Sequence, residues 1–236
     1  MEKELYREKM EMSLSQEELY FYLSRQLEFF FPDGYSPPKN ILKKSIHEGL
    51  ERCENCFRHI KVHGYNNNAG VLFSHLHMDQ YATFLYFTSN TLWKKYGEKQ
   101  ACDKIMNLQK VLNGLVLSYK CPMPDIFMLA HPVGSVIGNA NYSDGLYISQ
   151  NVTINTHVNE NNKLDLYIGK GVMLCTGAKI IGNKPIGDRV SIGADVLVYN
   201  RQIENDKVVV NSAEGILVRD RTSKMCKCSL VFDLDF

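Results

Sequence analysis

The chain lacks a net charge of either sign, a long apolar run and a typical export signal. Its 236 residues carry 27 Lys and Arg against 26 Asp and Glu, a formal net charge of +1. So balanced a surface offers no broad attraction for nucleic acid or for a membrane of anionic lipid, and neither is expected as a partner. The apolar runs are too short to span a membrane, and the opening segment MEKELYREKMEM is too charged for a secretory signal. We therefore expect a cytoplasmic protein.

Cysteine is present in an odd number, seven, scattered along the chain. Without an export signal, these residues are expected to be reduced thiols. Cys53 with Cys56, and Cys226 with Cys228, could on paper form a zinc site of four thiolates. The first pair falls inside a predicted amphipathic helix and the second lacks the usual spacing, so no metal is expected.

The first half of the chain has the rhythm of helices. Ser15 and Glu18 form a capping box ahead of an apolar-periodic run, which predicts a first helix that stops at Pro32. The Asn-rich run VHGYNNNAG is expected to be a loop. Glycine or proline punctuation predicts three further helices, over residues 39–60, 74–97 and 98–113. These elements predict an all-α helical domain over residues 1–122.

The second half repeats an aliphatic residue at every sixth position. The series comprises Ile168, Leu174, Ile180, Ile186, Ile192 and Val198. A helix repeats its buried face every 3.6 residues and a strand every second residue, so a period of six needs one inward side chain per short strand, with a turn after each. This is the hexapeptide pattern of a parallel β-helix.

The same series extends toward the N-terminus, through Ile154, Ile148, Tyr142 and Val136. The step from Ile154 to Ile168 is not a multiple of six, so the polar stretch between them is expected to leave the coil as a loop. The tail beyond Arg201 has β-like runs without the regular step, and the pattern does not place it.

Residues 73–220 contain four distinctive stretches: the helical FLYFTSNTLW, FMLAHPVGSVIG, ISQNVTIN and IGKGVMLCTGAKIIGNKPIGDRVSIGADVLV. These stretches resemble the serine acetyltransferases, members of the left-handed β-helix acyltransferase superfamily. The resemblance implies an α+β fold, with a left-handed parallel β-helix and an irregular tail over residues 123–236. It also implies acetyl-CoA as co-substrate, a small-molecule acceptor, and assembly as a homotrimer or a dimer of trimers.

The resemblance further assigns roles to individual residues. It implies that His131 is the catalytic base. Four residues fall where the family lines the acetyl-CoA arm: Thr156, Thr176, Gly177 and Ala194. Imidazole suits the role of base because its pKa lies near neutrality.

The sequence departs from the family at positions that handle serine. Ala130 stands where the family has an Asp, Val116 where it has the Asp that orients the histidine, and Asp165 where it has a second histidine. HLHMDQY and HPVG are closer in form to acetyltransferase-like proteins encoded with polysaccharide genes. The expected acceptor is therefore a small hydroxylated molecule such as a sugar, which would receive an O- or N-linked acetyl group.

A catalytic histidine also needs an acceptor on its other ring nitrogen. The candidates are Asp125, Asp79, Asp165 and a backbone carbonyl. His75 and Asp79 would share one face of the third helix and are candidates for binding the acceptor. His157, in the expected loop, and Asp165 are further acceptor-binding candidates.

Three other functions stay open at this point. One is a serine O-acetyltransferase in the strict sense, and another is a β-helix that has lost catalysis and serves as a scaffold or regulatory subunit. A zinc hydratase on the same coil would need several converging histidines. Only His131 and His157 lie in the coil region, which makes this the weakest alternative.

Overall fold

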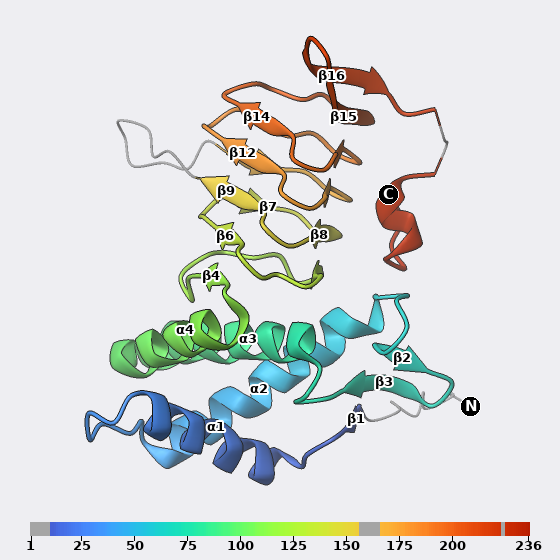
Figure 1. Ribbon diagram of the computed structural model, residues 1–236. Coiled ribbons are helices and arrows are strands. Elements are labelled where there is room, and N and C mark those ends of the chain that lie inside the picture. The colour runs from blue at the N-terminus through green and yellow to red at the C-terminus, as the bar shows by residue number, and fades with distance from the viewer. Residues whose placement is uncertain (1–9, 156–165, 223–224) are drawn as a thin grey trace.

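The computed structural model describes residues 10–155, 166–222 and 225–236. A layer of helices lies at one end of the molecule, and a stack of short strands rises from it (Figure 1). The C-terminal segment returns beside the stack toward the helices. The expected order of helices followed by a parallel coil is confirmed. No helix in the described residues is long and apolar enough to cross a membrane.

The four expected helices form where the sequence signals place them: α1 (Gln16–Phe30), α2 (Lys39–Arg58), α3 (Met78–Tyr96) and α4 (Lys99–Asn113). The Ser15 hydroxyl accepts a hydrogen bond from the Glu18 amide, and the Glu18 carboxylate accepts one from the Ser15 amide, so the capping box is confirmed. The third and fourth helices end at Gly97 and Gly114, which adopt the left-handed conformation.

The helical part is not all α, which corrects the sequence prediction. A three-stranded sheet in the order β1-β3-β2 lies beside the helices, from β1 (Glu11–Met12), β2 (Asn66–Asn67) and β3 (Gly70–Phe73). The run expected to be a loop thus contains a hairpin. Val71 and Phe73 alternate into the core, but a run this short is hidden among the asparagines.

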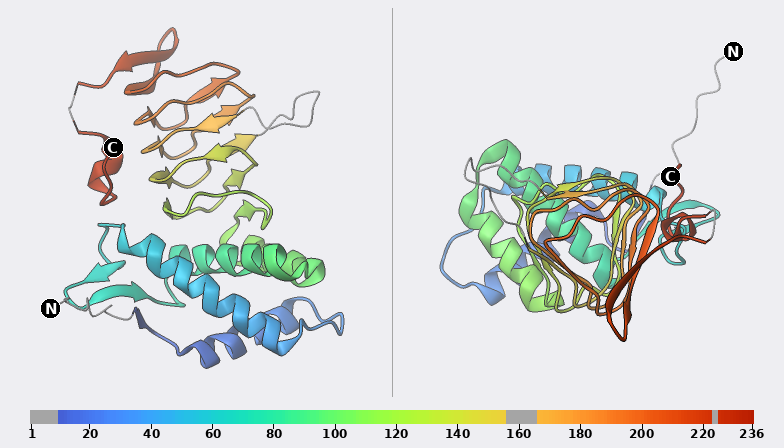
Figure 2. Two further views of the ribbon diagram at one scale, coloured as in Figure 1. Left: turned by 180° about the vertical axis from the view of Figure 1, so that it is seen from behind. Right: turned by 90° about the horizontal axis from the view of Figure 1, so that it is seen from above.

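The coil has three faces, and viewed from above it is triangular (Figure 2). One face has the strand order β16-β15-β13-β11-β8-β5, from β5 (Phe127–Leu129), β8 (Leu146–Ile148), β11 (Met173–Leu174), β13 (Ser191–Ile192), β15 (Lys207–Ser212) and β16 (Gly215–Asp220). The next has the order β14-β12-β9-β6-β4, from β4 (Val116–Leu117), β6 (Val136–Ile137), β9 (Thr153–Asn155), β12 (Lys179–Ile181) and β14 (Leu197–Tyr199). The third pairs β7 (Asn141–Tyr142) with β10 (Tyr167–Ile168), extended by bridges at Ile186 and Ile203.

All these pairings are parallel except the closing β15–β16 hairpin. β4 precedes the expected domain division at residue 122 and already belongs to the coil.

The aliphatic ladder lines the interior of the coil as predicted. Every member from Ile168 to Val198 is at most 2% exposed. Tyr142 pairs in step with Ile168, but Val136 points outward and Ile137 is the buried residue of β6. The register explains this error: Leu129 and Ile137 are eight residues apart, whereas Ile148 and Ile154, on the next coil, are six apart. The first coil therefore carries two extra residues at its corner.

The tail, which the sequence pattern did not place, contacts both the coil and the helical part. Its described end contains a 3₁₀ turn (Lys227–Leu230), and Phe232 forms an antiparallel bridge with Ile60, just after the end of α2. Phe236 packs against the coil at Gly145 and Gly171, where a Cβ would lie 2.3 and 2.8 Å from its ring. Glycine is needed at these two corners because any side chain would displace the aromatic ring.

Candidate functional site

One edge of the coil, where the chain leaves the β5–β15 face, is built from stacked tight turns. Gly134, Asn151, Gly177 and Asp195 occupy equivalent positions on successive coils, with φ between 55° and 75°. The Gly134 amide donates a hydrogen bond to the Gly114 carbonyl at the end of α4, and each of the other three donates to the coil before it, as Gly177 does to the Gln150 carbonyl (3.0 Å). We call this edge, with the residues that flank these four, the corner column. Because main-chain bonds fix it, side chains on it have defined positions.

His131 lies in the two-residue enlargement of the first turn of this column. Its φ is 51°, a conformation that few residues with a side chain adopt, and Pro132 follows it. Its carbonyl accepts a hydrogen bond from the Val133 amide (2.7 Å), which closes the turn. The side chain is 83% exposed. The enlarged turn therefore directs the imidazole out of the coil, where a reactant can reach it.

Asp79 is the carboxylate that the helical layer supplies to His131. Its Oδ2 lies 3.5 Å from the histidine Nδ1, and its side chain is only 8% exposed. This separation is longer than a hydrogen bond but within ion-pair range. Asp79 stands in the first turn of α3, where the helix dipole favours a negative charge. Of the three carboxylates considered from sequence, Asp79 is the one with a recorded contact to the imidazole; Asp125 lines a polar groove with His47 and Arg52 of α2, and Asp165 lies outside the described residues.

Three of the four residues expected to contact acetyl-CoA lie on the corner column. Thr176 and Gly177 form its turn on the third coil, and Ala194 lies one coil further on. The Thr176 carbonyl accepts from the Asp195 amide at 2.8 Å, so these two turns are directly stacked. At about 4.8 Å per coil, Ala194 lies about 14 Å along the edge from the turn of His131. Thr156 lies outside the described residues.

His75 is not on α3, which corrects the expectation that it shares a helical face with Asp79. It lies in the turn before the helix, which begins at Met78. Its Nδ1 is hydrogen-bonded to the Ser13 hydroxyl (2.8 Å), and its ring packs edge-on against Tyr22. Through these contacts, His75 holds the segment around Ser13 against the helical part. His157, the remaining acceptor-binding candidate, lies outside the described residues.

The sequence interpretation missed Tyr65, which lies behind Asp79. Its side chain is buried, and burial followed by the nearby Asp79 carboxylate raises its pKa well above the usual range. The phenol therefore stays neutral beside the carboxylate. Its ring also contacts His77, whose Nδ1 is buried with no hydrogen-bond partner in the described structure. The only sequence signal was one aromatic residue in the run HGYNNN, which reads as a loop.

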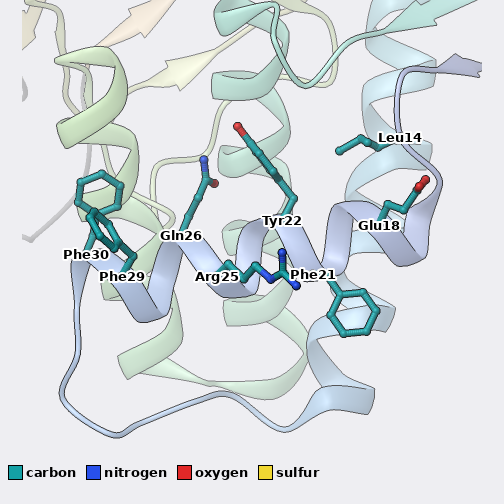
Figure 3. Close-up of a pocket in the computed structure, with 8 residues that line it drawn as sticks. All are labelled: Leu14, Glu18, Phe21, Tyr22, Arg25, Gln26, Phe29 and Phe30. Carbon is teal, nitrogen blue, oxygen red and sulfur yellow. The ribbon is translucent and has the colours of Figure 1, made fainter.

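A second hollow lies on α1, in the helical layer (Figure 3). It is an open groove of about 600 Å³, lined by Leu14, Glu18, Phe21, Tyr22, Arg25, Gln26, Phe29 and Phe30. Phe29 and Phe30 project beside each other at one end of the helix. The groove is largely apolar, shares no residue with the corner column and lacks a histidine, so it does not offer a base for group transfer.

Comparisons with known proteins point in one direction. No protein-family model matches the chain. A putative serine acetyltransferase of Schizosaccharomyces pombe is 31% identical over 119 residues, which is 50% of this chain and 44% of that protein. A serine acetyltransferase of Staphylococcus aureus (strain Mu50) is 30% identical over 130 residues, 54% of this chain and 61% of that one. The chain thus spans about half the length of these relatives.

Solved structures extend the likeness to most of the chain. The serine acetyltransferase of Neisseria gonorrhoeae has a TM-score of 0.67 at 19% identity and covers 92% of this chain and 84% of that one. A serine acetyltransferase in complex with CoA has a TM-score of 0.62 at 18% identity, covering 86% and 84%. At such identities the likeness establishes a shared fold. The class of architecture is therefore that of serine acetyltransferases, and none of these matches is named for a sugar or a polysaccharide.

Proposed function

We propose that this protein is an acetyl-CoA-dependent O-acetyltransferase with His131 as general base and serine as the first acceptor to test. The observation that carries the proposal is the imidazole beside Asp79, at one end of an edge that also holds Thr176, Gly177 and Ala194. The names of the relatives support both the co-substrate and the hydroxyl acceptor. The proposal includes the left-handed sense of the coil and a location in the cytoplasm.

In the proposed acetyl transfer, His131 accepts one proton and later releases it. Its Nε2 takes the proton from the acceptor hydroxyl as the oxygen attacks the thioester carbonyl, a C–O bond forms and the C–S bond breaks. The imidazolium then returns the proton to the departing thiolate. Asp79, across the ring at Nδ1, would hold the tautomer with Nε2 free and stabilise the imidazolium. The carboxylate acts on the histidine and is a positioning residue in this scheme.

The corner column suits a long, thin co-substrate. Gly177 has no side chain and is covered by the exposed Asp195 carboxylate, which could rotate away, and Ala194 is small and exposed. The stacked turns also offer polar main-chain groups for hydrogen bonds. We propose that acetyl-CoA lies along the edge through Thr176, Gly177 and Ala194, with Thr156 completing this set.

The acceptor side of the proposal rests on His157, Asp165 and Asp79, with His75 in a supporting position through Ser13. The absence of carboxylates at Ala130 and Val116 is the observation that keeps a sugar acceptor as the second candidate. A thiol-release assay with L-serine and with a panel of hydroxylated sugars separates the two. Turnover with serine alone supports the first candidate, and turnover with a sugar alone replaces it.

A second copy of the chain would complete the site. His131 is largely exposed in one chain, and the β4–β14 face beside it presents exposed apolar side chains: Val116, Val136, Leu197 and Tyr199. We propose a homotrimer with this face at the interface, since apolar surface of this kind marks protein contacts. The apolar groove on α1 (Figure 3) is the surface through which two trimers could pair.

His131→Ala tests the base. We expect turnover to fall at least about a hundredfold, while calorimetry still shows saturable binding of acetyl-CoA. His47→Ala is the matched control, because His47 is an exposed histidine on α2 bonded to Gln16. Normal turnover of His131→Ala would refute the assignment of the base. Wild-type protein with no saturable acetyl-CoA binding would instead support the scaffold alternative.

Asp79→Asn tests the positioning role separately. We expect kcat to fall by about tenfold to a hundredfold, with KM for acetyl-CoA unchanged and an altered pH profile of kcat. Asp79→Glu should restore part of the rate. A loss of folded protein without a change in the pH profile of the remaining activity would indicate a structural role only.

A further inference from the structure

The tail packs against a second edge of the coil, which is distinct from the corner column. This edge stacks turns at Gly145, Gly171, Arg189 and Asp206, all with φ between 57° and 77°. Cys226 meets the edge at Gly171, whose carbonyl oxygen lies 3.3 Å from its Sγ. The ring of Phe236 packs against Gly145 and Gly171 on the same edge. The pair Cys226 and Cys228, which the proposed acetyl transfer does not use, is therefore held against the coil by contacts on both sides.

The two thiols form a pair one layer below the surface. Both side chains are buried, with Cys226 at the N-cap of the 3₁₀ turn and Cys228 two residues further on within it. Met225 and Lys227, which alternate with them, are exposed. Cys175, on the coil, is the nearest further thiol with an electrostatic effect on Cys228.

Two guanidinium groups face this pair. Arg189 and Arg221 share Asp206: Arg189 binds its carboxylate through Nε and Nη2 (2.9 and 2.7 Å), and Arg221 binds through Nη2 (2.5 Å). The Nη1 of Arg221 is buried with no hydrogen-bond partner in the described residues. The Asp188 carboxylate also acts on Arg189, and Arg221 is the cation that favours the Cys226 thiolate.

This environment separates the two thiols chemically. The hydrogen bond from Cys228, opposed by burial and aided by Arg221, lowers the pKa of Cys226 to about 6. The same bond and burial raise the pKa of Cys228 far above its ordinary value. The Gly171 carbonyl favours the protonated form of Cys226 and works against this effect. Cys226 is thus suited to be the thiolate that reacts with an oxidant, and Cys228 to be the thiol that then forms the disulfide.

We propose that Cys226 and Cys228 are a redox-active dithiol that a hydroperoxide oxidises to an intrachain disulfide. The Cys226 thiolate attacks the terminal oxygen; an S–O bond forms, the O–O bond breaks, and hydroxide leaves from hydrogen peroxide or an alkoxide from an organic hydroperoxide. The Cys228 sulfur then attacks the sulfenic sulfur; the S–S bond forms and water leaves. The protein loses two electrons and the peroxide gains them. This site is independent of acetyl transfer.

The test exposes the native protein to stoichiometric hydrogen peroxide, alkylates the remaining thiols after denaturation, and digests with trypsin. Cleavage after Lys227 separates the two cysteines, so a disulfide appears as peptides 225–227 and 228–236 joined, two hydrogens lighter than the free pair. We expect this species in wild type. Recovery of both peptides alkylated and separate, while other thiols are oxidised, would overturn the proposal.

Four variants sharpen the result. Cys228→Ser should stop the reaction at the sulfenic acid of Cys226, which dimedone traps, and this readout does not require the disulfide. Arg221→Gln should slow the oxidation about tenfold and Arg221→Lys should restore it, if positive charge favours the thiolate. Cys102→Ala, which removes a buried thiol in α4, is the control and should leave the rate unchanged. Equal rates for Gln and Lys at position 221 would refute the electrostatic part.

Discussion

Gly177 is the residue whose replacement best separates folding from function. It has a φ of 71° and lies at the turn of the corner column where the co-substrate is proposed to bind. A Cβ placed on it would lie 2.1 Å from Oδ1 of Asp195 on the next coil. Gly177→Ala therefore strains the backbone and pushes an exposed carboxylate off its position. We expect a modest loss of stability and a larger loss of acetyl-CoA binding.

The magnitude follows from these two effects. An alanine in the left-handed region costs about 1–2 kcal/mol. The clash adds little, because the Asp195 side chain is exposed and can rotate away. A loss of about 1–2 kcal/mol corresponds to a decrease in Tm of about 2–8 °C for a chain of this size. Binding should weaken about tenfold or more, because the displaced carboxylate and the new methyl group both occupy the edge.

Gly182→Ala is the matched control. Gly182 has a φ of 112° and its Cβ would lie 2.9 Å from the Asn200 backbone, but it is at a different corner of the coil. It should cost at least as much stability, about 1–3 kcal/mol, without weakening acetyl-CoA binding. Thermal unfolding at one fixed protein concentration and calorimetric titration provide the two measurements. Equal affinities for both variants would refute the location of the binding edge.

Three further predictions follow from the packing. Ile137→Asp should prevent folding because it buries a charge in the coil, whereas Val136→Asp should fold with a normal circular dichroism spectrum; the opposite result would mean that the register is wrong. Asp33→Asn should lower the free energy of unfolding near neutral pH, and the difference should vanish in acid. The hydrogen bond from Lys104 holds the pKa of Asp33 below its ordinary value of 3.8, so the carboxylate's contribution is present above that value and lost as pH falls below it. Urea titrations at several pH values check this, and a constant difference would contradict it. Phe236→Ala should free the tail and speed its proteolysis; unchanged cleavage would show that other contacts hold it.

Local signals account for most of the elements. The capping box at Ser15, the glycines after two helices and the six-residue ladder all act through bonds and periods within a few residues, so the sequence reveals them. The same reasoning failed at Val136, because two extra residues in one turn shift the register without changing the local pattern. The small sheet beside the helices was missed because its strands are too short to show a period.

The candidate site likewise combines features that the sequence predicts with contacts that only the folded chain creates. The sequence alone determined a coil with one inward aliphatic residue per strand, because a repeating backbone geometry imposes a repeating residue choice. His131 was picked out by the resemblance of its surroundings to a known family and not by the repeat. Only the tertiary structure decided that Asp79 and not Asp125 meets the imidazole, and that the tail brings Cys226 to Gly171. Such pairs lie far apart in the chain. Their proximity depends on how separate elements pack, which no local period encodes.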